Sequence, residues 1–177
     1  MVCTGNLCRS PMATGLMRHA LAERSCGDVE VVSAGTWAQR DSKATTEAVT
    51  VLADRGVDLT RHRSRPLTRS DLEDADLIVA MTSEHVGEIL DLAPEVELRV
   101  VLLKALAEMD VSELDADASR ADRLRALLSA ARPQPLPAHD LRDPIGASLR
   151  TYATSATEIS EAVDVLVTAL CGPPSTA

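Results

Sequence analysis

The sequence predicts an α/β fold with a parallel sheet. Two observations support it. Short apolar runs alternate along the chain with segments of helical periodicity, and a turn-rich segment of eight residues near the start leads directly into a helix. A chain of 177 residues fits one domain. We expect this domain to span residues 1–171, with residues 172–177 as a flexible tail.

Helices are predicted where apolar residues recur at helical spacing and boundary residues flank them. Ser83 is a candidate N-terminal cap, while Gly56 and Gly172 are candidate stop signals. The predicted helices are residues 11–24, 45–55, 83–92, 118–131 and 148–170. Strands are predicted where short β-branched or apolar runs occur, at residues 29–33, 77–81 and 96–103.

The first strand is expected to be truncated in this sequence. Only Met1 and Val2 precede the turn-rich segment that begins at Cys3. Strands of globular proteins usually have about 5–6 residues, and an incomplete central strand leaves backbone groups unpaired on both of its neighbours. We therefore expect the reading frame to continue upstream with further strand residues.

Composition narrows the class of protein. The net charge of −9 argues against nucleic acid as a partner. The chain shows neither a membrane span nor a signal peptide, and its four cysteines do not suggest a disulfide scaffold. We expect Cys26 and Cys171 to be structural or incidental, and we expect a cytoplasmic protein.

A zinc site is a competing interpretation of Cys3 and Cys8 together with a histidine. The gap between these cysteines is at the edge of the usual ligand spacing, and no second cysteine pair follows it. We therefore expect no metal and no other cofactor.

The segment Cys-Thr-Gly-Asn-Leu-Cys-Arg-Ser at residues 3–10 has the composition of a phosphate site with a covalent nucleophile. Gly5 permits a sharp turn, so that loop amides and the positive end of the following helix dipole converge on an anion. Arg9 can bind two phosphate oxygens, and the same field favours the thiolate form of Cys3. Pro11 suits the first helical turn.

The run Val-Cys-Thr-Gly-Asn-Leu-Cys-Arg-Ser-Pro resembles the signature of the low-molecular-weight protein tyrosine phosphatases. Later segments resemble further landmarks of that family in the expected order: residues 33–36, 62–65, 76–81 and 143–144. The resemblance implies the phosphotyrosine phosphatase I-like fold, a three-layer sandwich with a four-stranded parallel sheet. It also implies hydrolysis of phosphotyrosine through a phosphocysteine intermediate.

The resemblance assigns three catalytic roles. Cys3 is the nucleophile, Arg9 the phosphate clamp and Asp143 the general acid, which protonates the leaving tyrosine oxygen and then activates water. Asp140 is the alternative acid, and a plain Asp-Pro turn is the alternative reading of Asp143. The substrate-binding residues are expected in and near the loop: Thr4, Gly5, Asn6, Leu7, Cys8, Arg9, Ser10 and Trp37.

A supporting set of side chains is implied by the same resemblance: Asn6, Ser10, Ser33 and His62. These side chains are expected to hold the loop open through hydrogen bonds. Ser10 is alternatively a plain helix cap, and His62 is alternatively a solvated side chain of a basic loop.

The substrate pocket departs from the family pattern. Family members commonly have an aromatic residue after Asp-Pro, whereas this chain has Ile145 and Gly146. Trp37 is then the candidate aromatic wall, or alternatively a core tryptophan.

Two further features extend this interpretation. Cys8 is expected to form a reversible disulfide with Cys3 that protects the nucleophile from over-oxidation. Residues 104–141 form a longer segment than the family pattern predicts, with an acidic patch (Asp110, Glu113, Asp115 and Asp117) and a Pro-rich stretch at residues 133–137. We interpret this segment as an elaborated surface loop and helix, with a docking element as the alternative.

Two other functions compete with phosphotyrosine hydrolysis. One is arsenate reduction on the same scaffold, which the intact Cys8 and Asp143 argue against. The other is phosphate binding without catalysis. The expected partners are phosphotyrosine proteins, among them a bacterial tyrosine kinase, and the chain is expected to be a monomer or a weak homodimer without nucleic-acid or membrane partners.

Overall fold

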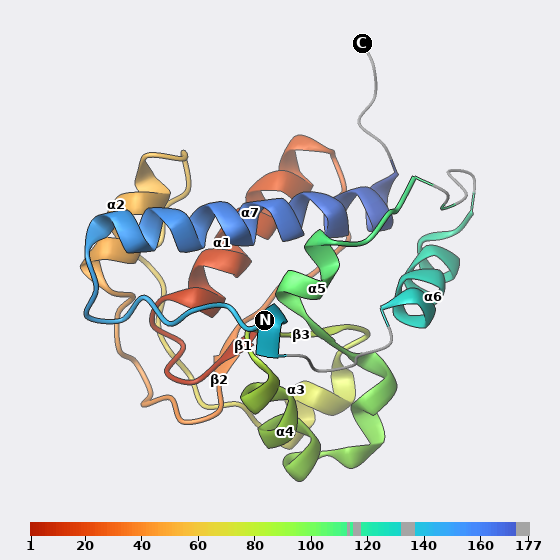
Figure 1. Ribbon diagram of the computed structural model, residues 1–177, viewed down its shortest axis with the longest axis horizontal. Coiled ribbons are helices and arrows are strands. Elements are labelled where there is room, and N and C mark those ends of the chain that lie inside the picture. Colours follow the sequence, from red (N-terminus) through yellow and green to blue (C-terminus); the bar gives the residue numbers. More distant parts are fainter. Residues whose placement is uncertain (113, 115–117, 132–136, 173–177) are drawn as a thin grey trace.

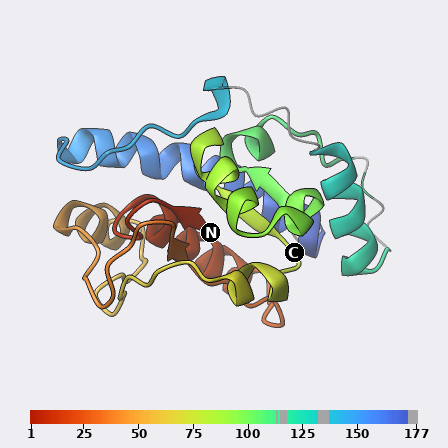
Figure 2. The same cartoon turned by 90° about the horizontal axis from the view of Figure 1, so that it is seen from below.

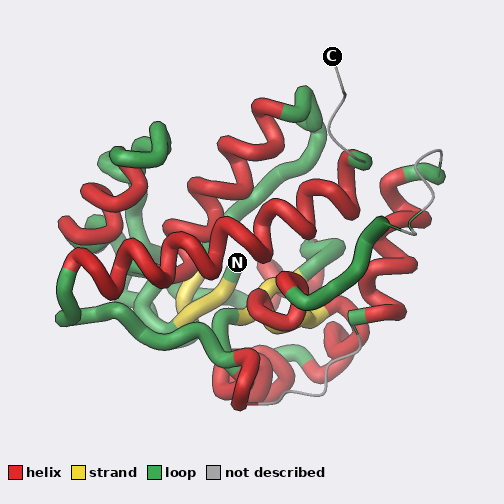
Figure 3. The backbone as a smooth tube through the Cα atoms, turned by 45° about the horizontal axis from the view of Figure 1, so that its top comes forward, coloured by secondary structure: helices red, strands yellow, loops and turns green. Residues whose placement is uncertain are grey.

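The computed structural model describes residues 1–112, 114, 118–131 and 137–172. Within these residues the sheet has four strands in the order β2-β1-β3-β4, and every pairing is parallel. The strands are β1 (Val2–Cys3), β2 (Ala34–Gly35), β3 (Ile78–Ala80) and β4 (Val100–Leu102). Figure 3 shows helices on both sides of the strands. The predicted fold class is therefore confirmed.

All five predicted helices are present, together with two short ones that the sequence analysis missed. The helices are α1 (Arg9–Glu23), α2 (Thr46–Ala53), α3 (Arg69–Asp74), α4 (Ser83–Leu92), α5 (Leu103–Ala107), α6 (Arg120–Ala130) and α7 (Leu149–Cys171). Two 3₁₀ segments, Pro94–Arg99 and Pro137–His139, complete the secondary structure of the described residues. The missed helices α3 and α5 are too short to show a helical period.

Three predicted boundaries were wrong. Residues 29–33 do not form a strand, because β2 contains only Ala34 and Gly35. The first part of the predicted 96–103 strand is a 3₁₀ turn that begins at Pro94, a residue suited to the start of a helical turn. The cap of α4 is Thr82, whose hydroxyl accepts the amide N–H of His85, so Ser83 is the first helical residue.

Alternating strand residues build two apolar layers. On β3, Ile78 and Ala80 belong to one cluster with buried residues of α3 and α4, and Val79 belongs to the other. The cluster that contains Val79 also contains apolar residues of α1, α2 and α7. Figure 1 accordingly shows α3 and α4 below the sheet and α7 above it, with α2 and α6 at opposite ends, an arrangement that Figure 2 repeats from below.

Strand β1 contains only two residues, as the short run before Cys3 predicts. Beside it lies a cavity of about 720 Å³, lined by residues 28–34 on one side and 74–79 on the other. The Met1 ammonium donates to the Val32 carbonyl at 3.0 Å in this region. Burial lowers the pKa of this ammonium to about 6, so its charge is costly here.

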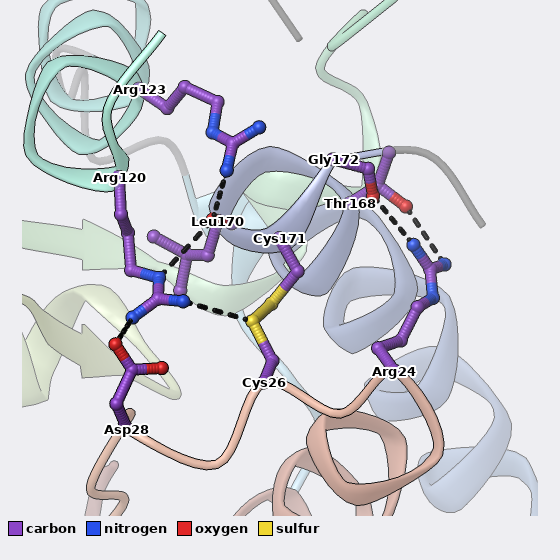
Figure 4. The surroundings of a disulfide bond; sticks show 9 residues. All are labelled: Arg24, Cys26, Asp28, Arg120, Arg123, Thr168, Leu170, Cys171 and Gly172. Carbon is purple, nitrogen blue, oxygen red and sulfur yellow. Dashed lines mark hydrogen bonds and ion pairs between the residues drawn. A yellow bond between two sulfur atoms is a disulfide. The ribbon is translucent and has the colours of Figure 1, made fainter. Parts of the chain in front are cut away.

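A disulfide joins Cys26, just after α1, to Cys171 at the end of α7 (Figure 4). These cysteines were expected to be structural or incidental, and the bridge gives them a structural role. The pairing itself was not predicted, because it depends on helix packing that brings together residues separated by 145 positions. Arginines from two elements surround the bridge in Figure 4. Arg24 and Arg123 donate to the carbonyls of Gly172 and Leu170, two acceptors at the carboxyl end of α7.

The segment from Lys104 to Leu141 packs onto the core through α5 and α6. Leu106 and Leu127 are fully buried in the same cluster as α7. Of its predicted features, Asp110 is described and exposed, whereas Glu113, Asp115, Asp117 and residues 133–136 lie outside the described residues. None of the described helices is both long enough and apolar enough to cross a membrane.

Candidate active site

Neighbouring elements fix the backbone of the loop that follows β1. The amides of Thr36 and Trp37, just beyond β2, donate to the carbonyls of Cys3 and Thr4, each at 3.0 Å. Parallel strands end at one edge of the sheet, so this is where loops from different strands meet. Gly35 is required there, because a Cβ atom at this position would lie 2.4 Å from the Thr4 carbonyl oxygen.

Asn6 makes the sharp turn of the loop. Its φ of 53° lies in the left-handed region, which asparagine tolerates better than most residues. Its side chain is fully buried: Nδ2 donates to the Ser10 hydroxyl at 2.9 Å, and Oδ1 accepts the Arg65 amide at 3.1 Å. Gly5 was expected to make this turn, but its φ is not positive. Asn6 both turns the loop and holds it.

Cys3 and Ser10 face each other across the loop. Their Sγ and Oγ atoms are 3.0 Å apart, and both residues are buried. Because the Ser10 oxygen already accepts from Asn6, its proton is free to go to the sulfur. Ser10 is not the cap of α1, since that position belongs to Cys8. A hydroxyl donor on sulfur stabilises a thiolate, as a nucleophilic cysteine requires.

Arg9, only 4% exposed, is held from two sides. Its Nη2 donates to Asp143 Oδ2 at 2.7 Å, and its Nη1 donates to the Leu141 carbonyl at 3.2 Å. Its Nε is buried without a partner among the described residues. A buried donor without an acceptor destabilises the folded protein. A hydrogen-bond acceptor bound beside the loop would therefore be stabilised by the Nε–H of Arg9.

Asp143 lies at the mouth of the site, with 44% of its side chain exposed. Its Oδ1 also accepts the Ile145 amide at 3.1 Å, so the Asp-Pro turn and the approach to Arg9 coexist. Asp140, the alternative acid, is occupied elsewhere. Its carboxylate accepts both the amide and the hydroxyl of Ser83 at the start of α4. The geometry thus favours Asp143 over Asp140.

Cys8 is a free, buried thiol in the same loop. Its Sγ lies 3.9 Å from Asp143 Oδ1. Burial raises the pKa of Cys8 to about 12, and Cys3 and Asp143 act in the same direction. Cys8 is therefore protonated at neutral pH and does not compete with Cys3 as the nucleophile.

Three predicted side chains have different outcomes. His62 reaches the loop, with Nε2 lying 2.8 Å from the Asn6 carbonyl oxygen, and burial lowers its pKa. Ser33 does not reach the loop: it lines the cavity beside Met1 and makes no hydrogen bond to the loop within the described residues. Trp37 is 76% exposed, so the core alternative is wrong, and its indole N–H donates to Glu88 at 2.5 Å.

The remaining loop residues also have defined places. The Leu7 carbonyl accepts the Thr45 amide just before α2, and the Thr4 hydroxyl lies 2.8 Å from Nε2 of His85. His85 was not predicted as a site residue. It is a buried histidine, and the feature of the sequence that could have indicated it is its position shortly after a buried strand. No group of three His, Cys, Asp or Glu side chains suited to a metal ion occurs in the described part of the chain.

Comparison with known proteins identifies the family of the chain. Residues 1–117 match the family model described as low molecular weight phosphotyrosine protein phosphatase. A protein-arginine-phosphatase of Bacillus subtilis is 49% identical over 84 residues, which cover 48% of this chain and 55% of that protein. A protein-arginine-phosphatase of Geobacillus stearothermophilus is 31% identical over 165 residues, covering 93% of this chain and 90% of the relative.

Similarity in structure extends over nearly the whole chain. The crystal structure of a low molecular weight protein tyrosine phosphatase from T. tengcongensis matches with a TM-score of 0.73 and 30% identity. The match covers 94% of each chain. It therefore includes α7 and the Asp143 segment, which lie beyond the residues that the family model matches.

Proposed function

Because the chain belongs to the low molecular weight phosphotyrosine protein phosphatase family, we propose that it hydrolyses phosphotyrosine in proteins through a phosphocysteine intermediate on Cys3. One observation carries the proposal. Arg9 is buried with an unpaired Nε and with Nη2 bound to an exposed carboxylate. A phosphate dianion can take both donors in the bidentate geometry that guanidinium favours.

The first chemical step follows from this exchange. Phosphate binding to Arg9 releases Asp143 from its ion pair, and the freed carboxylate takes up a proton from solvent and lies beside the leaving group. The Cys3 thiolate attacks phosphorus, and the bond between phosphorus and the tyrosine oxygen breaks as Asp143 delivers a proton to that oxygen. The products are tyrosine and an enzyme with a phosphorus–sulfur bond at Cys3.

The second step returns the enzyme to its starting state. Asp143, now a carboxylate, takes a proton from water as the water oxygen attacks phosphorus. The phosphorus–sulfur bond breaks, and the Ser10 hydroxyl stabilises the departing Cys3 thiolate at the 3.0 Å separation seen in the free site. Phosphate then leaves, Asp143 gives up its proton to solvent, and its carboxylate pairs with Arg9 again.

Phosphoarginine hydrolysis is the second candidate function. It is favoured by one observation: the relative that matches 93% of this chain is a protein-arginine-phosphatase. Matched peptides that carry phosphotyrosine or phosphoarginine at the same position separate the two functions. A kcat/KM at least tenfold higher for phosphotyrosine supports the proposal, and the opposite ratio assigns the chain to phosphoarginine. Arsenate reduction, assayed in parallel with a thiol reductant, is expected to be absent.

The proposed partners are phosphotyrosine proteins, including a tyrosine kinase, and the proposed state is a monomer or weak homodimer. A cytoplasmic location is proposed because Cys3 and Cys8 must be reduced for activity. The Cys26–Cys171 bridge is instead of the kind that persists in oxidising compartments. Rapid alkylation of the protein in cells, followed by a count of the alkylated cysteines, distinguishes a reducing from an oxidising compartment. Four alkylated cysteines indicate a reducing compartment, and two indicate an oxidising one.

A further inference from the structure

His85 joins the start of α4 to the nucleophile loop. It is 1% exposed, and each of its ring nitrogens lies beside a hydroxyl. Nε2 is 2.8 Å from Thr4 Oγ1, and Nδ1 is 2.7 Å from Thr82 Oγ1. Thr82 follows β3, the neighbour of β1 in the sheet, so the fold brings this histidine behind the residue that follows Cys3.

The hydrogen bonds around Thr82 determine which ring nitrogen carries the proton. The Thr82 oxygen already accepts the His85 amide at 3.4 Å, and its own proton has no other acceptor than Nδ1 among the described residues. Nδ1 therefore accepts, and Nε2 carries the proton and donates to Thr4. Burial lowers the pKa of His85 to about 4, with the Arg9 charge acting in the same direction, so the ring is neutral at neutral pH.

This arrangement leaves the hydroxyl proton of Thr4 available as a hydrogen-bond donor. When Thr4 accepts from Nε2, its own hydroxyl proton remains available. Thr4 is exposed, unlike its neighbour Cys3, and it has no other side-chain partner within the described ranges. The available proton therefore lies at the open side of the loop, one residue after the nucleophile.

We infer that His85 is a positioning residue that orients the Thr4 hydroxyl as a hydrogen-bond donor to the bound phosphate group. The inference rests on the proposed function, since it assigns Thr4 and His85 to the same phosphate site. It extends that function by two side chains, because loop amides and Arg9 account for phosphate binding without them. A merely structural histidine would stabilise the loop without any requirement for a donor at Nε2.

Amide side chains separate these two roles. In His85→Gln the amide nitrogen takes the place of Nε2 and keeps the donor to Thr4, whereas in His85→Asn the amide oxygen takes the place of Nδ1 and keeps only the acceptor for Thr82. We expect His85→Gln to retain kcat/KM within about threefold. We expect His85→Asn to lose about tenfold, the scale of one buried hydrogen bond. Thr4→Ser keeps the hydroxyl and should lose less than Thr4→Val, which should lose about as much as His85→Asn.

The double variant His85→Asn/Thr4→Val supplies the decisive comparison. If His85 acts through the Thr4 hydroxyl, the double variant should be no worse than Thr4→Val alone. Multiplied losses, or equal losses in His85→Gln and His85→Asn, would overturn the inference. Melting temperatures show whether a loss of activity comes from a loss of stability. The two His85 variants each lose one hydrogen bond, so they should melt at similar temperatures while their activities differ.

Binding of inorganic phosphate provides a readout that does not require turnover. The dissociation constant of phosphate should follow the same order across the variants, with about a tenfold weakening in His85→Asn and in Thr4→Val. If wild type hydrolyses neither phosphopeptide, the proposed function fails and the phosphate series alone decides the role of His85. Unchanged phosphate affinity in both variants would overturn the inference even in an active enzyme.

Discussion

Arg9 and Asp143 form an ion pair across the mouth of the site, with 2.7 Å between Nη2 and Oδ2. The two residues are separated by 134 positions in the chain, and the guanidinium is buried while the carboxylate is partly exposed. In the proposed mechanism this pair is the resting state of the site, and the two charged groups separate when phosphate binds to Arg9.

Replacing Asp143 tests its role as the proton donor. Asp143→Asn should lower kcat for phenyl phosphate by ~10²–10⁴-fold, because the tyrosine-like oxygen leaves poorly without a proton. The loss should shrink for substrates with more acidic leaving groups. The measurement is kcat across a series of substituted aryl phosphates.

Asp140→Asn is the matched control for this experiment. Asp140 accepts the amide and hydroxyl of Ser83. Asparagine keeps one acceptor oxygen, so the replacement should lower the free energy of unfolding by about 0.5–1.5 kcal/mol, the scale of one hydrogen bond. Its activity should fall by less than tenfold. A larger loss of kcat in Asp140→Asn than in Asp143→Asn would transfer the acid role to Asp140.

Trp37 should select aromatic substrates. Its indole is 76% exposed and is held by Glu88, which presents an aromatic surface near the loop. Trp37→Ala should raise KM for a phosphotyrosine peptide about three- to tenfold, the scale of one aromatic contact. The KM for glycerol phosphate, which has no ring, should not change.

Leu98→Ala provides the control for Trp37→Ala, since Leu98 is 74% exposed but lies in the 3₁₀ turn before β4, away from the carboxyl ends of the strands. It should leave both KM values unchanged. Equal effects of Trp37→Ala on aromatic and non-aromatic substrates would show that Trp37 does not contact the ring.

The Cys26–Cys171 bridge should contribute to stability and not to catalysis. It closes a loop of 145 residues, and removal of a native bridge typically costs about 2–5 kcal/mol in the free energy of unfolding. The double variant Cys26→Ser/Cys171→Ser should lose stability of this order in denaturant titrations, with kcat/KM within about twofold of wild type. Equal stability of the variant and the oxidised wild type would show that the bridge does not constrain the unfolded chain.

Cys8 should form the protective disulfide with oxidised Cys3 only slowly at neutral pH. Peroxide converts the Cys3 thiolate to a sulfenic acid, and the Cys8 thiolate then displaces hydroxide to form the disulfide. Because burial raises the pKa of Cys8 to about 12, its thiolate fraction and the rate of bridge formation should rise about tenfold per pH unit between pH 7 and 9. Peptide mapping after timed quenching measures this rate.

Cys8→Ser should lose the protection without losing the initial activity of the reduced enzyme. After peroxide treatment, thiol should restore wild type more completely than the variant. Recovery that is identical in the two proteins, or a rate of bridge formation independent of pH, would remove Cys8 from this role.

Local sequence predicted the parts of the site that lie within one short segment. Cys3, Arg9 and Ser10 are fixed relative to each other by a loop of eight residues and the first turn of α1. The α/β alternation then places this loop at the carboxyl edge of the sheet. The contact of His62 with Asn6 followed from family resemblance, because nothing in a basic loop indicates which backbone group a histidine will meet.

Contacts between distant segments were harder to predict. Ser33 and Gly35 belong to the same short run, and only packing shows that Gly35 touches the loop while Ser33 lines a cavity. Gly5 was the expected turn residue from backbone freedom alone, yet Asn6 adopts the left-handed conformation because its buried amide is satisfied there. The Cys26–Cys171 bond likewise depends on how α1 and α7 pack.

The phosphocysteine intermediate can be trapped by acid quenching during turnover of a phosphotyrosine peptide and detected by mass spectrometry of the N-terminal fragment. We expect one phosphoryl group on Cys3, formed and lost at rates compatible with kcat, and neither adduct nor turnover in Cys3→Ala. Turnover that persists in Cys3→Ala, or a wild-type enzyme that turns over without any phosphoryl group on Cys3, would contradict the covalent mechanism.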